Sequence, residues 1–182
     1  MPTVHYAFEF LHPHTHLVGV GIDVPAHAGD YTDLTLPAWL PGAYKIFDNA
    51  RNIRNFRAET PDGTALRVER MTWQTWRVHD RGEGCSVAYE AFWNKPEIHQ
   101  GQLNAHHAFL NPGTLACFVV GHQEDWPCTL EVDAPLGWRV ATGLEATGES
   151  TFAAANYEEL IDCPLEVGLH ELATFSQDGV DY

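Results

Sequence analysis

The feature that most constrains the fold is the alternation of apolar and polar residues along short segments of the chain. In residues 3–11, the apolar side chains at the even positions from Val4 to Phe10 fall on one face of an extended chain. A period of two residues is typical of a half-buried β-strand, whereas a helix needs a period of 3.6. We expect a strand at 3–11 and a second strand at 16–24 as its antiparallel neighbour.

Similar segments recur between turn signals such as 61-PDG-63. We expect further strands at 32–36, 53–59, 65–71, 73–79, 85–93, 115–121, 128–134, 138–142 and 165–175. Only 154–162 has a helical pattern, with Asn156 as its N-cap and Pro164 after its end, and a second helical turn fits 47–52. Many short strands with little helix predict an all-β fold, an antiparallel β-sandwich with one or two short helical turns.

The size and the charge of the chain limit its organisation and its partners. At 182 residues without a repeat or a linker, we expect a single domain over 1–182. The formal net charge is −15, and nine of the ten basic residues lie within 45–95. Nucleic acids and anionic membranes require a clustered surplus of positive charge, so we expect neither as a partner.

The chain has four cysteines, Cys85, Cys117, Cys128 and Cys163, without a Cys-x-x-Cys pair. The amino terminus lacks a basic flank followed by an apolar run, as a signal peptide would have. Apolar runs also stay below the 18 residues of a candidate membrane helix. We therefore expect a cytoplasmic protein with reduced thiols.

Candidate metal ligands gather in 12-HPHTH-16. His12, His14 and His16 share one side of an extended chain, a spacing that suits a metal, but Pro13 favours a bend on which surface histidines are ordinary. The pair His170-Glu171 begins like the zinc signature His-Glu-x-x-His, although Thr174 stands where the second histidine is needed. We therefore do not expect this chain alone to be a complete enzyme.

The stretch 36-LPAWLPGAYKIFDNARNI-53 is the best candidate for a working surface. Pro37 and Pro41 fix the backbone and remove two donors, and Gly42 favours a turn. We expect Trp39 to anchor this bend on the core. For Tyr44, two interpretations stay open: it covers the edge of the core, or its polar tip meets a ligand.

This stretch resembles a run in the glycyl aminopeptidase family of zinc metallopeptidases, Pro-x-Trp-x-Pro-Gly-Ser-Tyr-x-Ile-Arg-Asp-aromatic-x-Arg-Asn. The matching residues are Pro37, Trp39, Pro41, Gly42, Tyr44, Ile46, Asp48, Arg51 and Asn52. Ala43, Phe47 and Asn49 depart from the run, and they replace a serine, an arginine and an aromatic residue. A hydroxyl and a guanidinium are thereby lost.

Other segments resemble the same family in the same order. They are 135-PLGWRVATGL-144, 152-FAAANYEELIDCPLEVG-168, and Leu103-Asn104 with Phe109 and Asn111, where Asn104 stands in place of a usual aspartate. The resemblance implies a β-rich module that precedes a thermolysin-like catalytic domain. That domain holds the zinc in the family, so the resemblance implies no cofactor in this chain.

Two functions remain open. The first is a non-catalytic amino-terminal domain of a zinc aminopeptidase, which packs on the catalytic domain of the same polypeptide and shapes the cleft for a peptide substrate. Tyr44 and Asn104 are the residues expected to face that cleft. The alternative is a free-standing binding module for peptide or carbohydrate. It is weakened because Trp73 and Trp76 would point to opposite faces of one strand.

Overall fold

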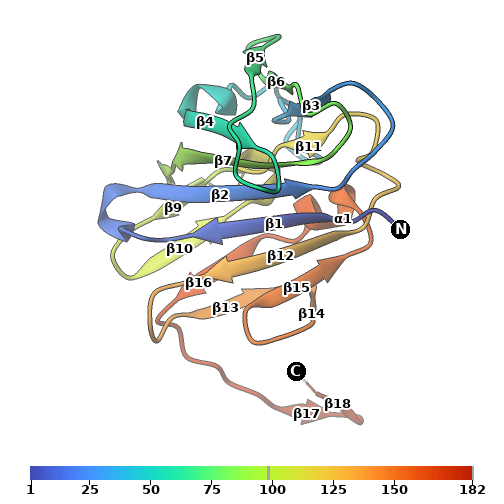
Figure 1. Ribbon diagram of the computed structural model, residues 1–182. Helices are drawn as coiled ribbons and strands as arrows, with labels where there is room; N and C mark the ends of the chain where they lie inside the picture. The colour runs from blue at the N-terminus through green and yellow to red at the C-terminus, as the bar shows by residue number, and fades with distance from the viewer. Residues whose placement is uncertain (98, 182) are drawn as a thin grey trace.

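Three β-sheets pack around one hydrophobic core in the computed structural model, which describes residues 1–97 and 99–181 (Figure 1). The largest sheet has seven strands in the order β14-β15-β12-β1-β2-β7-β4. In chain order they are β1 (Val4–Glu9), β2 (Leu17–Val24), β4 (Ile53–Glu59), β7 (Cys85–Phe92), β12 (Cys128–Asp133), β14 (Glu145–Ala146) and β15 (Thr151–Ala154). The prediction of an all-β fold is confirmed.

The other two sheets complete the layers around the core. The five-stranded sheet has the order β13-β16-β10-β9-β8 and contains β8 (Asn94–Lys95), β9 (Gly101–Leu103), β10 (His107–Leu110), β13 (Arg139–Thr142) and β16 (Leu165–Gly168). The four-stranded sheet has the order β11-β3-β6-β5 and contains β3 (Thr32–Thr35), β5 (Val68–Arg70), β6 (Thr75–Val78) and β11 (Phe118–Val119). A hairpin of β17 (Ser176–Gln177) and β18 (Val180–Asp181) extends away from this body (Figure 1).

Helical structure is confined to short pieces. The α-helix α1 comprises Tyr157–Asp162, and 3-10 turns lie at Pro13–Thr15, Asn49–Asn52 and Pro112–Thr114. The predicted cap of α1 is confirmed, because the Asn156 side chain accepts a hydrogen bond from the Glu159 backbone N–H at 3.0 Å. The helix was expected to start at residue 154, but Ala154 is the last residue of strand β15 and the helix begins after its cap, at Tyr157. No helix among the described residues is both long and apolar enough to cross a membrane.

The first strand lies in the middle of the largest sheet. β1 pairs antiparallel with β2, as predicted, with Tyr6 opposite Ile22. On its other side β1 pairs with β12 in parallel, with Val4 beside Cys128. Parallel neighbours need a crossover connection. Here the chain between β1 and β12 forms all of the four-stranded sheet and part of the five-stranded sheet before it returns.

The core lies on the inner face of the seven-stranded sheet. Alternate residues of its strands face inward, and Phe8, Val18 and Ala91 are fully buried there. The residues between them, such as Glu9 and Glu90, lie on the outer face of the sheet. The period of two in the sequence therefore corresponds to one buried and one solvated face of this sheet.

Three buried tyrosines hold an irregular segment between the sheets. Their hydroxyls donate to successive backbone carbonyls: Tyr89 to Leu115 at 2.7 Å, Tyr157 to Ala116 at 2.7 Å and Tyr6 to Cys117 at 3.1 Å. Burial raises the pKa of all three phenols well above the usual value, so they remain protonated donors. The strand predicted at 115–121 is consequently wrong in its first half, because side chains satisfy that backbone in place of a sheet.

The strand predicted at 165–175 ends early, at Gly168 in β16. Both neighbours of β16 end there too, since His107 of β10 and Arg139 of β13 are opposite Gly168. A strand cannot continue in a sheet without a partner, although the apolar residues continue along 169–175.

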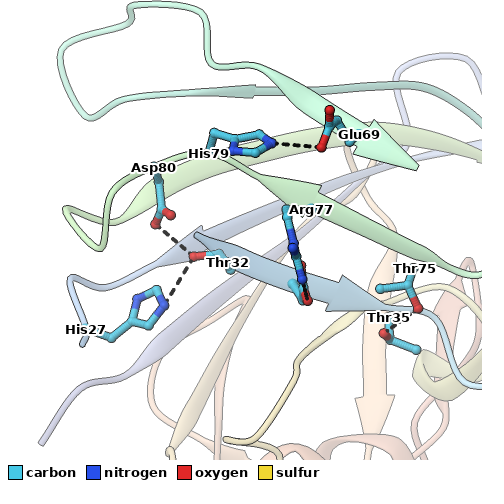
Figure 2. A network of polar contacts seen from close by, with 9 residues as sticks. His27, Thr32, Thr35, Glu69, Thr75, Arg77, His79 and Asp80 are labelled. Atoms are coloured by element: carbon cyan, nitrogen blue, oxygen red, sulfur yellow. Dashed lines mark hydrogen bonds and ion pairs between the residues drawn. The ribbon is translucent and has the colours of Figure 1, made fainter. Parts of the chain in front are cut away.

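Polar contacts join the strands of the four-stranded sheet and the loops beside it (Figure 2). Arg77 of β6 donates two hydrogen bonds of 2.7 Å to the Asp33 carboxylate of β3. This bidentate pair raises the pKa of Arg77. Nearby, the hydroxyl of Thr32 donates to the buried Asp80 carboxylate at 2.8 Å. The contacts fix β3, and the candidate site begins where β3 ends.

Candidate functional site

The proline-rich stretch forms a small hairpin directly after β3. We call residues 37–49 the aromatic hairpin. At its tip, the Ala43 backbone N–H donates to the Leu40 carbonyl at 3.2 Å, with Pro41 and Gly42 between them. Gly42 has a φ of +79°, so the tip has the proline and glycine of a type II turn. The predicted bend is confirmed.

The two arms of the hairpin contact each other across the turn. Trp39 and Ile46 form an antiparallel bridge, and the Phe47 backbone N–H donates to the Ala38 carbonyl at 2.8 Å. This pairing puts Leu40 and Phe47 inside, where they are 3% and 5% exposed. The expectation that Trp39 anchors the bend is wrong, because Leu40 and Phe47 do so.

An exposed apolar surface results on the outer side of the aromatic hairpin. Trp39 is 50% exposed, Tyr44 84% and Ile46 70%. The Trp39 and Tyr44 rings meet edge to face with their centroids 6.3 Å apart. Of the two interpretations of Tyr44, the exposed position agrees with a contact to a ligand or partner and does not agree with a cover over the core.

The backbone of Tyr44 is strained. Its φ is +51°, in the left-handed region that glycine adopts easily and a residue with a Cβ seldom does. Such outliers persist only where the surrounding structure over-determines them, and they cluster at functional sites. Here Tyr44 lies between the turn at 41–42 and Ile46, which forms the bridge with Trp39. The chain is therefore fixed on both sides of Tyr44.

Two clefts flank the aromatic hairpin, each with a volume of about 450 Å³. The apolar cleft, on the side of α1, is lined by Pro37, Trp39, Pro41, Phe118, Tyr157 and Ile161, among others. The basic cleft, on the side of Lys95 and Gln100, is lined by Lys45, Asn49 and Arg51 as well, and also by Asp48 and Glu97. The hairpin therefore separates a surface suited to apolar side chains from a charged one in which cations outnumber carboxylates.

Asn104 lies in the turn between β9 and β10, where its side-chain oxygen accepts hydrogen bonds from the backbone N–H groups of His106 at 2.9 Å and His107 at 3.1 Å. These bonds give it a role in the turn. Strand β9 separates it from the aromatic hairpin, because Gln100 before β9 contacts Asn49 of the hairpin and Asn104 follows the other end. The structure does not bring Tyr44 and Asn104 together.

The histidines of 12–16 lie in the turn between β1 and β2, which contains the 3-10 turn Pro13–Thr15. The His16 ring Nδ1 is 2.5 Å from the Leu103 carbonyl oxygen, and the His12 and His14 ring centroids are 6.0 Å apart. Over residues 1–97 and 99–181, no three side chains of His, Cys, Asp or Glu are placed to hold a metal ion together.

The tryptophans of the alternative binding surface do not form a platform. Trp76 is 5% exposed, and its ring stacks on Phe56 at a centroid distance of 4.8 Å. Trp73 is 47% exposed and lies before β6, in the connection from β5.

The sequence did not reveal the basic cleft. The surplus of basic residues in 45–95 can be read from the sequence, but the contact between Asn49 and Gln100, which brings Lys95 close to Lys45 and Arg51, cannot. The sequence shows only that position 49 is unusual, because the resembling family has an aromatic residue there.

Comparison with known proteins gives one family and a set of similar structures. The family model described as the peptidase M61 N-terminal domain matches residues 5–169. A comparison with curated protein sequences gives no match. The crystal structure of an aminopeptidase N family protein from Idiomarina loihiensis is similar, with a TM-score of 0.88 and 29% identity over 98% of this chain.

The chain spans 31% of the Idiomarina loihiensis protein. An M1 zinc metallopeptidase from Deinococcus radiodurans also matches, with a TM-score of 0.49, 15% identity, and coverage of 92% of this chain and 41% of that chain. The family match covers nearly the whole described sandwich, including the aromatic hairpin. The chain therefore belongs to the M61 peptidase family, as its amino-terminal domain.

Proposed function

We propose that this domain forms one wall of the substrate cleft of a zinc aminopeptidase, packed on a catalytic domain of the same polypeptide. The observation that carries the proposal is the exposed face of the aromatic hairpin, with Trp39, Tyr44 and Ile46 outside and a strained backbone at Tyr44. In the proposal, this face contacts the peptide near its amino end.

The exposure of this face supports a contact with another molecule. Soluble domains rarely leave adjacent large apolar side chains in water unless a ligand or partner covers them. The hairpin is also rigid, because Leu40 and Phe47 are buried and Gly42 completes the turn. A rigid aromatic surface loses little conformational entropy when it binds a peptide.

The zinc of the proposed enzyme belongs to the catalytic domain. The histidines of 12–16 do not fit a zinc site, because His16 is engaged with the Leu103 carbonyl. This domain contributes shape and charge instead. A peptide with a free amino terminus is cationic at that end, and the net charge of −15 favours its approach. The proposal places the enzyme in the cytoplasm.

The test uses the polypeptide that carries both domains and compares Tyr44→Phe with Tyr44→Gly. Tyr44→Phe removes only the hydroxyl, whereas Tyr44→Gly removes the ring and relieves the left-handed backbone. We expect Tyr44→Gly to lower kcat/KM for glycyl and alanyl peptides by up to about tenfold, as the loss of one aromatic contact implies. The domain should keep its thermal stability, because Tyr44 is exposed.

Tyr31→Phe is the matched control, since Tyr31 is another exposed tyrosine outside the hairpin. It should leave kcat/KM unchanged. Unchanged kinetics in both Tyr44 variants, with the fold intact, would show that the hairpin is only scaffold.

A further inference from the structure

The basic cleft concentrates positive charge in an acidic chain. Lys45, Arg51 and Lys95 line it and provide three of the ten Lys and Arg residues in the protein. Within the described parts of the chain, none of these three forms an ion pair with a carboxylate. Asp48 and Glu97 also line the cleft and are likewise without an ion pair there. The cleft therefore has a local formal charge of +1, whereas the whole chain has −15.

Asn49, which lines the basic cleft, has a buried hydrogen-bond donor without an acceptor among the described residues. Asn49 is 2% exposed and Gln100 5%, and Gln100 Nε2 donates to Asn49 Oδ1 at 3.3 Å. Asn49 Nδ2 is buried and has no partner among the described residues. Buried donors are nearly always paired, so this amide is a group in the lining of the cleft that an acceptor would satisfy.

One of the cations is held beside the aromatic hairpin. The Lys45 ammonium lies 4.8 Å from the centroid of the buried Phe47 ring, a cation–π arrangement. Lys45 directly follows Tyr44. The proposed peptide contact and the basic cleft therefore belong to the same hairpin.

We propose that the basic cleft is a subsite for a carboxylate of the peptide substrate. The inference rests on the proposed function and narrows the substrate class to peptides that carry a carboxylate beyond the residue to be released. Arg51 can bind such a group with two parallel hydrogen bonds, and Lys45 and Lys95 bind it as point charges. The carboxylate comes from an acidic side chain or from the carboxyl terminus of a short peptide.

The test measures KM for three dipeptides on the polypeptide with both domains: alanyl-glutamate amide, alanyl-glutamine amide and alanyl-glutamine with a free carboxyl terminus. The first carries a side-chain carboxylate, the second none and the third a terminal carboxylate. We expect a lower KM for at least one carboxylate peptide than for the neutral amide. Lys95→Gln and Arg51→Gln should each reduce that preference by about three- to fivefold, and added salt should reduce it as well.

Arg57→Gln is the control, because it removes the same charge from an exposed arginine outside the basic cleft. It should leave the preference unchanged. A preference confined to the glutamate amide assigns the subsite to an acidic side chain, and one confined to the free acid assigns it to the carboxyl terminus.

Three outcomes would overturn the inference: no preference for a carboxylate, a preference that persists in both cleft variants, or an equal loss in Arg57→Gln. Its failure is distinguishable from failure of the proposed function. If Tyr44→Gly lowers kcat/KM while the cleft variants keep the preference, only the carboxylate subsite is wrong. If the Tyr44 variants have no effect either, both proposals fail.

Discussion

Removal of the Tyr89 hydroxyl tests whether buried tyrosines hold the segment 115–117 in place. This hydroxyl donates to the Leu115 carbonyl at 2.7 Å and accepts from the Cys117 N–H at 3.0 Å. Tyr89→Phe keeps the ring, which stacks on Phe56, but leaves two buried backbone groups without a partner. Each such group costs about 1–3 kcal/mol; because the segment can relax in part, we take about 1–2 kcal/mol for each group and expect a loss of about 2–4 kcal/mol in the free energy of unfolding.

Tyr157→Phe provides the internal comparison. Among the described residues, the Tyr157 hydroxyl has one backbone partner, the Ala116 carbonyl at 2.7 Å. Its side chain is buried like that of Tyr89. Its removal should therefore cost about half as much, about 1–2 kcal/mol. The difference between the two variants depends on the number of groups left unpaired, because both replacements are chemically the same.

Urea unfolding at neutral pH measures both values, and thermal unfolding checks them. In a chain of this size, 1 kcal/mol lowers Tm by about 2–4 °C, so Tyr89→Phe should lower it by about 5–15 °C. A loss for Tyr89→Phe that is equal to or smaller than that for Tyr157→Phe would refute the reasoning. It would mean that the 115–117 backbone finds other partners when the hydroxyl is absent.

Two further predictions concern the core. Burial raises the pKa of the thiols of Cys85, Cys117 and Cys128 from 9.0 to about 12, so stability is complete below about pH 9 and falls as the pH rises from 9 towards 12. The loss should be about 1.4 kcal/mol per pH unit and thiol in urea titrations, and an unfolding energy that stays flat from pH 8 to 11 would contradict it. Gly101→Ala should destabilise by about 3 kcal/mol or more, because its Cβ would lie 2.6 Å from the buried Trp93 Nε1. Gly63→Ala, with open space around its Cβ, should cost about 1 kcal/mol, and equal losses in thermal melts would exclude the steric argument.

Five of the seven strands of the largest sheet could be predicted because one of its faces is buried and the other is solvated, whereas the short strands β14 and β15 were missed. The residues of β1, β2, β7 and β12 show this alternation directly. Strands β8, β9 and β10 were missed, because they have two to four residues each and turn residues such as Pro96 and Asn104 interrupt the pattern. A period cannot be read from so few positions.

The end of β16 shows a second limit of sequence patterns. An apolar pattern shows which face of a strand is buried, but it says nothing about the length of the neighbouring strands. Here β10 and β13 both stop opposite Gly168, so the strand stops as well. The lengths of the neighbouring strands β10 and β13 are set by the fold and cannot be read from the sequence of β16.

For the candidate site, the sequence was sufficient for the turn and insufficient for the orientation of its side chains. Pro41 and Gly42 predicted the turn correctly. The burial of Leu40 and the exposure of Trp39 depend on the bridge between Trp39 and Ile46, which neither arm indicates alone. The position of Asn104, in the turn between β9 and β10, depends on two strands that the sequence did not reveal.

The structure explains the effect of two residues, Phe47 and Asn49, at which the chain departs from the run in the resembling family. Phe47 replaces an arginine at a position that is 5% exposed, and it anchors the aromatic hairpin and supports the Lys45 ammonium. Asn49 replaces an aromatic residue at a position that is 2% exposed, and it brings an amide to the lining of the basic cleft. One replacement removes a charge from the interior side of the hairpin, and the other adds a polar group there. Positive charge is thereby left to Lys45, Arg51 and Lys95 around the opening, where an incoming carboxylate would first meet it.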